Sequence, residues 1–232
     1  MGGQACILYG AAEFSRDTDF AVLHSDENLE RLKAALRELA ARPVFFPPLE
    51  AAYLARGHAC HFRCGHPDAD GFRVDVMSVL RGCDPFDALW SRRMLIDLPD
   101  APEVAVLSLA DLVLAKKTQR DKDWPMIRRL VEADYERHKS NPNDEALGFW
   151  LRESRTPAHL IEIAGAAGAA FDREIGGRPL LEHARAGDRD ALERALLDEQ
   201  EKERARDREY WAPLRAELES LRRARGQSGD SH

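Results

Sequence analysis

The chain has 232 residues, of which 44% are hydrophobic and 32% charged, and its formal net charge is −7. This balance is typical of a globular protein and excludes a disordered or fibrous chain, while the acidic charge disfavours an overall basic nucleic-acid clamp. No apolar run approaches the roughly 20 residues that cross a bilayer, and the N-terminus lacks the pattern of a signal peptide. The four cysteines are too few and too scattered for a disulfide scaffold. We therefore expect a cytoplasmic protein without membrane contact.

The N-terminal part predicts helices and strands in alternation. Gly2-Gly3 predicts a turn ahead of a short helix, and TDFAVLH (residues 18–24) predicts a strand. Ser25 is placed to cap a helix in which leucines recur at helical spacing. The three prolines within residues 42–49 end that helix.

Two hairpins and two helices follow. Strand-like runs at residues 58–64 and 72–79 flank the turn HPDADG, and runs at 94–98 and 104–107 flank PDAPE, with a short helix at 86–93 between the two pairs. Ser108 begins a capping-box pattern for a helix that we expect to reach Arg120. Asp123 is expected to cap the next helix, with Pro125 in its first turn.

The composition changes near residues 140–143 (SNPN), where we expect a domain boundary. Beyond it the pattern is helical, at about 145–153, 157–163 and in a long charged helix at 188–225. The expected organisation is a catalytic-type domain at 1–139, a helical C-terminal region at 140–225 and a disordered tail at 226–232.

Three carboxylates suggest a metal site. Because residues i and i+2 of a strand share a face, Asp17 and Asp19 point together, and a divalent cation would relieve their repulsion. Asp75 interrupts an apolar strand pattern in FRVDVMS, and all three can converge if its strand lies beside the first. Oxygen-only ligands suit Mg²⁺ or Mn²⁺. Gly2-Gly3, ahead of a helix, would offer backbone N–H groups to a phosphate. Together these features suggest phosphoryl or nucleotidyl transfer.

The same residues carry a resemblance. Gly2-Gly3, a thirteen-residue spacer and Asp17-Thr-Asp19 resemble the signature of the DNA polymerase β-like nucleotidyltransferase superfamily, and the later VDV run resembles its third-carboxylate strand. AKKTQRDKD (residues 115–123) resembles a segment of the bacterial abortive-infection toxin branch. The resemblance covers about residues 2–135. It implies an α/β (α+β) nucleotidyltransferase fold, a mixed sheet flanked by helices, here followed by the helical C-terminal region.

The resemblance also implies roles and partners. Asp17 and Asp19 would hold the metals, and Asp75 would bind the second metal or act as base. A nucleoside triphosphate would be bound by Gly2, Gly3, Ser15, Lys116, Lys117 and Arg120. A nucleoside monophosphate would pass to RNA (tRNA included), to a protein or to a small molecule, as in a toxin-type enzyme.

Two features depart from that family. Many relatives have arginine where this chain has Glu13. The family also has a strand before the Gly-Gly turn, which here is preceded by Met1 alone. Because of this departure, we expect the natural reading frame to begin upstream of Met1.

Several alternatives stay open. Asp75 is also suited to a salt bridge with Arg73, and Lys116 and Lys117 to a solvated helix face. The cluster of histidines and cysteines is more typical of a buried strand than of a zinc site, given its spacing; it comprises His58, Cys60, His61, Cys64 and His66. The C-terminal helix has a leucine stripe suited to packing on the chain, on a second copy or on a partner protein. The alternative function is a non-catalytic nucleotide-binding or toxin–antitoxin module.

Overall fold

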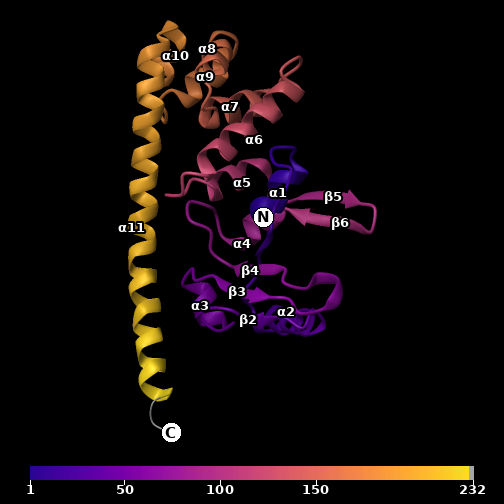
Figure 1. Cartoon of the computed structure of the whole chain (residues 1–232). Coiled ribbons are helices and arrows are strands. Elements are labelled where there is room, and N and C mark those ends of the chain that lie inside the picture. Colours follow the sequence, from indigo (N-terminus) through magenta and orange to yellow (C-terminus); the bar gives the residue numbers. More distant parts are fainter. Residues whose placement is uncertain (230–232) are drawn as a thin grey trace. The chain divides into compact units, whose positions relative to one another are not determined.

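The computed structural model describes residues 1–229, with side chains described as far as Arg223 (Figure 1). The chain forms two compact units, each built from segments distant in sequence. The first unit contains Met1–Leu8, Ala12–Ala115 and the chain from Arg208 onward, and the second contains Tyr9–Ala11 and Lys116–Asp207. The division at Ala115 differs from the boundary expected near residue 140, which lies between two helices of the second unit. No helix in the described part of the chain has the length and apolar character needed to cross a membrane.

The first unit is a mixed α and β structure. Its helices and strands, in chain order, are α1 (Gly2–Leu8), β1 (Asp17–Ala21), α2 (Asp26–Glu38), β2 (Arg42–Pro43), α3 (Ala51–Ala55), β3 (Cys60–Arg63), the 3₁₀ turn η1 (Pro67–Ala69), β4 (Arg73–Met77), α4 (Phe86–Ser91), β5 (Met94–Leu98), β6 (Ala101–Val106) and α5 (Leu109–Ala115).

A four-stranded sheet with the order β1-β4-β3-β2 forms the centre of this unit. β4 pairs antiparallel with β3 across the expected hairpin, and it pairs parallel with β1. The condition for convergence of the carboxylates, that the Asp75 strand lies beside the Asp17–Asp19 strand, is therefore met. The α/β character is confirmed at this coarser level.

The two faces of the sheet differ in character. One face packs an apolar cluster beneath α2 and α3, formed by Leu29, Leu36, Leu54, Cys60, Phe62, Cys64, Val74 and Val76. Because side chains alternate along a strand, the residues between them, including His61, Arg73 and Asp75, lie on the opposite face. The hydrophobic pattern therefore leaves a polar surface on the sheet.

The second expected hairpin is also present, as the antiparallel ribbon β5–β6. No third strand of the described chain pairs with it, and Met94, Leu95 and Leu98 are exposed on it. Its second strand begins at Ala101, earlier than expected, so the connecting turn is shorter than the PDAPE run suggested.

The helix expected from Ser108 to Arg120 is shorter than predicted and ends at Ala115. Thr118 explains the end, because its Oγ1 donates to Asp123 Oδ2 at 2.6 Å and its carbonyl accepts from Trp124 Nε1 at 2.8 Å. Such local bonds hold the chain in a turn that competes with helix continuation. Asp123 is the first residue of the next helix and not its cap, which is Lys122.

The second unit is helical, as expected from its sequence. Its helices are α6 (Asp123–His138), α7 (Asp144–Glu153), α8 (Pro157–Ala166), α9 (Gly168–Glu174), α10 (Leu181–Ala186) and the N-terminal part of α11 (Arg189–Gly229). The sequence analysis missed α9 and α10. Gly187, with φ of +70°, ends α10 in the left-handed conformation that favours glycine, and separates it from α11.

A buried ion pair connects helices within this unit. The Arg178 guanidinium is bidentate on Glu199 at 2.9 and 2.8 Å, and it also donates to the carbonyls of Leu151 and Ser154. Arg155 approaches the same carboxylate at 3.1 Å. The two arginines outweigh the effect of burial and hold the pKa of Glu199 below its usual value.

Helix α11 is 41 residues long and contains Pro213. It extends past the expected end at residue 225, so residues 226–229 of the expected tail are helical, and residues 230–232 lie outside the described chain. In the first unit, Leu214 is buried and Leu218 and Leu221 are partly buried. The expected leucine stripe therefore faces inward on the chain itself.

Candidate functional site

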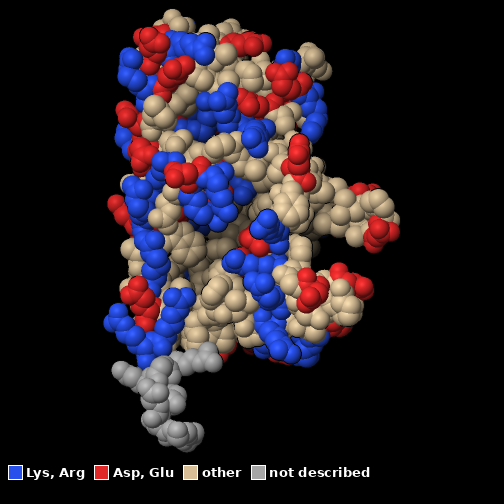
Figure 2. Space-filling model, in the orientation of Figure 1, with Lys and Arg blue, Asp and Glu red and all other residues tan. Residues whose placement is uncertain are grey.

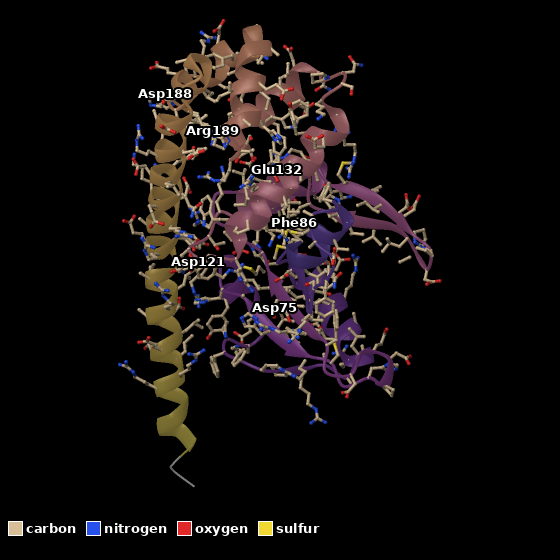
Figure 3. The ribbon with its side chains drawn as sticks, turned by 45° about the horizontal axis from the view of Figure 1, so that its top comes forward. Asp75, Phe86, Asp121, Glu132, Asp188 and Arg189 are labelled. Atoms are coloured by element: carbon tan, nitrogen blue, oxygen red, sulfur yellow. The ribbon has the colours of Figure 1, made fainter. Side chains whose placement is uncertain are left out.

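The parallel pairing of β1 with β4 brings the predicted carboxylates together. Asp17 is the cross-strand partner of Arg73, and Asp19 that of Asp75. Since paired positions on neighbouring strands share a face, all four side chains lie on the polar face of the sheet. Asp75 is labelled on this strand in Figure 3.

Asp75 is buried and already bound by two cationic or polar partners. It lies 2.8 Å from His61 Nδ1 on β3, and it accepts a hydrogen bond from Arg73 Nε at 2.8 Å. Burial raises the pKa of the Asp75 carboxyl, but the bonds from His61 and Arg73 outweigh it and leave the pKa below its usual value. The salt bridge to Arg73, one of the alternatives drawn from the sequence, is thus present.

Arg73 carries the positive charge of this cluster. Its hydrogen bond to Asp75 and the nearby charges of Asp17 and Asp19 raise the pKa of the guanidinium. Three carboxylates on one sheet face repel each other, and a fixed cation between them lowers that repulsion. His61 is a member of the site that the sequence analysis did not assign, whereas Arg73 was named there as a salt-bridge partner of Asp75.

The glycine pair packs directly against the carboxylate strand. Gly2 has φ of +69°, and a Cβ placed on it would lie 1.8 Å from Asp19 Oδ2. A Cβ on Gly3 would lie 2.3 Å from Ser15 Oγ, which itself donates to the Asp17 carbonyl at 2.8 Å. The position of Gly2 therefore requires glycine, and a side chain on Gly3 would displace the Ser15 hydroxyl. The five residues at these contacts come together as the sequence predicted.

The other predicted nucleotide ligands belong to the second unit. Lys117 pairs with Glu153 at 2.7 Å, and Lys116 and Arg120 pair with Asp123 at 3.6 and 2.7 Å. Lys116 lies in a turn and Lys117 beyond the end of α5, so the helical face expected for them does not exist. Their contacts within the unit are those of structural ion pairs.

Carboxylate oxygens are the ligand type that Mg²⁺ prefers, and Asp17 and Asp19 supply them. Asp75 is held by His61 and Arg73 in the arrangement described above. Among the residues that the structure describes, no group of three or more His, Cys, Asp or Glu side chains is placed to hold a metal ion. The donor chemistry fits a divalent ion at Asp17 and Asp19, whereas Asp75 could join only by exchanging its partners.

The histidine and cysteine cluster is divided among separate partners. His58 Nε2 lies 2.8 Å from Glu217, and His61 faces Asp75. His66 accepts from the Asp68 amide at 3.2 Å as the cap of η1. Cys60 is buried, which raises the pKa of its thiol to about 12 and disfavours the thiolate that a metal needs.

Comparisons with known proteins add no relative from which the role of this site could be transferred. No family model matches the chain, and no curated protein or solved structure is significantly similar to it.

Proposed function

We propose that the chain is a metal-dependent nucleotidyltransferase, which transfers a nucleoside monophosphate from a nucleoside triphosphate to an acceptor. One observation carries the proposal. The register of β1 on β4 aligns Asp19 with Asp75 and puts Asp17 on the same face. This is a concentration of carboxylates on rigid strands, as two-metal transfer chemistry requires.

The contact of the glycines with this strand supports the same reading. Gly2 fits against the Asp19 carboxylate with no room for a side chain. Asp17 and Asp19 would hold Mg²⁺ or Mn²⁺, and Asp75 would complete the ligand set or act as base. A bound ion would neutralise charge on the transferred phosphoryl group. Before an ion binds, Arg73 and His61 would hold Asp75 in place by the hydrogen bonds described above.

The acceptor is inferred from the family resemblance alone, which implies RNA, a protein or a small molecule. The toxin-type role has the same basis. A second candidate, a non-catalytic nucleotide-binding or interaction module, is favoured by one observation. Asp75 is satisfied by Arg73 and His61 without any metal. The two candidates differ in whether Asp75 is released when Mg²⁺ and a nucleotide bind.

Labelled nucleoside triphosphates, Mg²⁺ and a cell extract test the proposal. The wild-type chain should transfer label to an acceptor, and Asp17→Asn and Asp19→Asn should each abolish the transfer, because each removes a ligand charge. Asp100→Asn, a change of the same kind at an exposed turn between β5 and β6, is the control. Unchanged transfer by either site variant would remove this site. Nucleotide binding without transfer would favour the non-catalytic module.

A further inference from the structure

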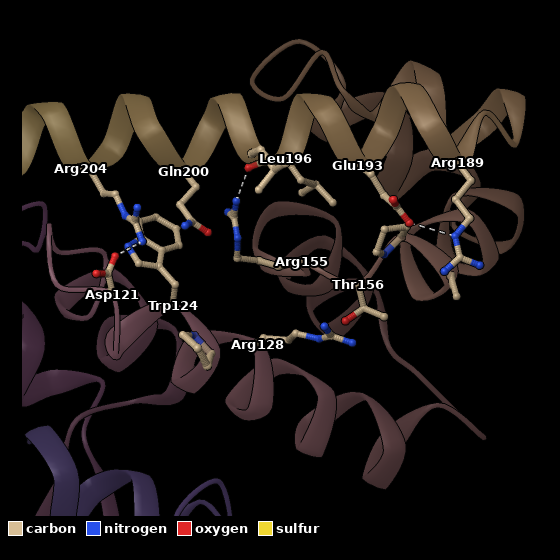
Figure 4. A pocket seen from close by; sticks show the side chains of 14 residues that line it. Asp121, Trp124, Arg128, Arg155, Thr156, Arg189, Glu193, Leu196, Gln200 and Arg204 are labelled. Carbon is tan, nitrogen blue, oxygen red and sulfur yellow. Dashed lines mark hydrogen bonds and ion pairs between the residues drawn. The ribbon is translucent and has the colours of Figure 1, made fainter.

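A cavity of about 610 Å³ lies in the second unit, between α6, the N-terminal end of α8 and the N-terminal part of α11 (Figure 4). Its volume is in the range of small-molecule sites, about 300–1,000 Å³. Four arginines line it: Arg128, Arg155, Arg189 and Arg204. We call it the arginine pocket. The proposed function uses none of these residues.

Two of the arginines form fixed walls. Arg155 is largely buried, pairs with Glu199 at 3.1 Å and lies over the Trp124 ring at 4.7 Å. Arg204 pairs with Asp121 at 2.7 Å, and its side chain is 17% exposed. Because these groups have close partners and little freedom, they shape the pocket and are not available to a ligand as free cations.

The other two arginines are free to take a new partner. Arg128 and Arg189 are 55% and 65% exposed, and within the described part of the chain each pairs with a glutamate four residues on, Glu132 at 2.8 Å and Glu193 at 3.0 Å. Exposed pairs of this kind contribute little to stability. In Figure 4 both side chains are drawn at the end of the pocket that also holds Thr156 and Glu193. Guanidinium groups bind phosphate through two parallel hydrogen bonds, so this end of the pocket suits a phosphate group.

The start of α8 adds to the positive potential at the same end. Thr156 is the N-cap of this ten-residue helix, but its hydroxyl makes no capping bond and donates instead to Glu132 Oε1. Thr156, Pro157 and Ala158 all line the pocket. Helix N-termini favour anions through their free N–H groups and dipole.

The remaining lining is apolar and supplies a surface for an organic group. Pro125, Leu196 and Leu197 line the pocket, and Leu197 is 63% exposed. The lining holds four arginines, one aspartate and one glutamate, and Glu132 and Glu199 pair with two of these arginines from outside the lining. On the face drawn in Figure 2, Lys and Arg side chains gather over α6 and α7 of this unit.

We propose that the arginine pocket binds a small phosphate monoester. Its phosphate lies between Arg128, Arg189 and Thr156, and its organic group lies on Leu196 and Leu197. A phosphate dianion would take the place of Glu132 and Glu193 as the partner of the two exposed guanidinium groups. The cavity volume of about 610 Å³ favours a small molecule over a polynucleotide. This inference goes beyond the proposed transfer reaction and does not depend on it.

Calorimetric titration with chosen probes tests the proposal on the full chain. The probes are glycerol 3-phosphate and AMP, with glycerol, adenosine and inorganic phosphate as their partial counterparts. The double variant Arg128→Gln/Arg189→Gln removes the two exchangeable cations. Its control, Arg129→Gln/Arg194→Gln, makes the same charge change at exposed neighbours on the same two helices that do not line the pocket.

At least one ester should bind the wild type and the control with equal affinity, and more tightly than its counterparts. The pocket variant should bind that ester with an affinity lower by about tenfold or more, since each charge-assisted hydrogen bond that is lost lowers the affinity severalfold. Should the double variant fail to fold, Arg189→Gln alone should lose several-fold in affinity. Absence of binding by either ester in the millimolar range, an equal loss in the control, or equal binding of inorganic phosphate would overturn the proposal. The proposal would also be overturned if the chain bound RNA and both double variants weakened that binding equally.

Discussion

At the scale of single residues, the site is defined by what surrounds Asp75. The sequence predicted that Asp17, Asp19 and Asp75 would share a face if their strands were neighbours, and the parallel pairing of β1 with β4 meets that condition. The partnership of Asp75 with His61 could not be predicted, since it depends on the register of β3 on β4. Register is a tertiary property, set by the whole apolar face of the sheet.

Asp75→Asn should destabilise the first unit by about 1–2 kcal/mol near neutral pH, because Arg73 and His61 then lack their charged acceptor. The pKa of Asp75 is lowered in the folded state, so its stabilising effect is present above its ordinary value near 3.8 and is lost as the pH falls through the folded value. Chemical denaturation at several pH values measures this. The difference between wild type and variant should shrink below about pH 4, and a difference that grows there would contradict the assignment.

Gly2→Ala and Gly82→Ala separate backbone strain from a steric clash. Both positions have positive φ, +69° and +76°, so alanine should cost each about 1 kcal/mol. Only Gly2 has a neighbour: a Cβ there would overlap Asp19 Oδ2, whereas nothing lies within 4 Å of one on Gly82. We expect weaker Mn²⁺ binding, measured by electron paramagnetic resonance, in Gly2→Ala alone. Equal binding in both variants would mean that Gly2 does not position Asp19.

At the scale of elements, the sequence predicted those with strong periodicity or capping signals. Both hairpins, α2, α6, α7 and α8 are where they were expected. The end of α5 was missed because Thr118 and Asp123 determine it by a side-chain bond. Helices α9 and α10 were missed because glycines and alanines give residues 164–187 no clear apolar period. The arginine pocket was missed because its charges come from separate helices.

Helix α11 should show different sensitivity along its length. Leu214→Ala should cost about 2–3 kcal/mol, since Leu214 is buried beside Gly57 in the first unit. Leu197→Ala on the same helix should change stability by less than about 0.5 kcal/mol, because Leu197 is 63% exposed. Urea denaturation compares the two variants. Similar costs would show that helix formation, and not burial, dominates.

At the scale of the whole molecule, the C-terminal part of α11 is a structural component of the first unit. Glu217 pairs with Arg56 and with the buried His58, and Tyr210 lies beside Gly57. In a chain that ends at Asp207, the backbone amides of α3 and β3 should therefore be less protected from hydrogen exchange. Those of the second unit should keep their protection. Hydrogen exchange resolved by peptide measures both units in one experiment. A chain that ends at Gly229 is the control, and equal protection in all three chains would show that this part of α11 is dispensable.

The first unit is assembled from both ends of the described chain, and this has a consequence for biosynthesis. A ribosome delivers residues at roughly 5–20 per second, N-terminal first. The sheet with Asp17, Asp19 and Asp75 is made early, but the segment that covers His58 is made after the entire second unit. During translation α3 and the residues before β3 therefore lack the partners that α11 supplies, while the helical unit can already fold. The buried His58 would gain Glu217 as its partner only once the last helix has left the ribosome.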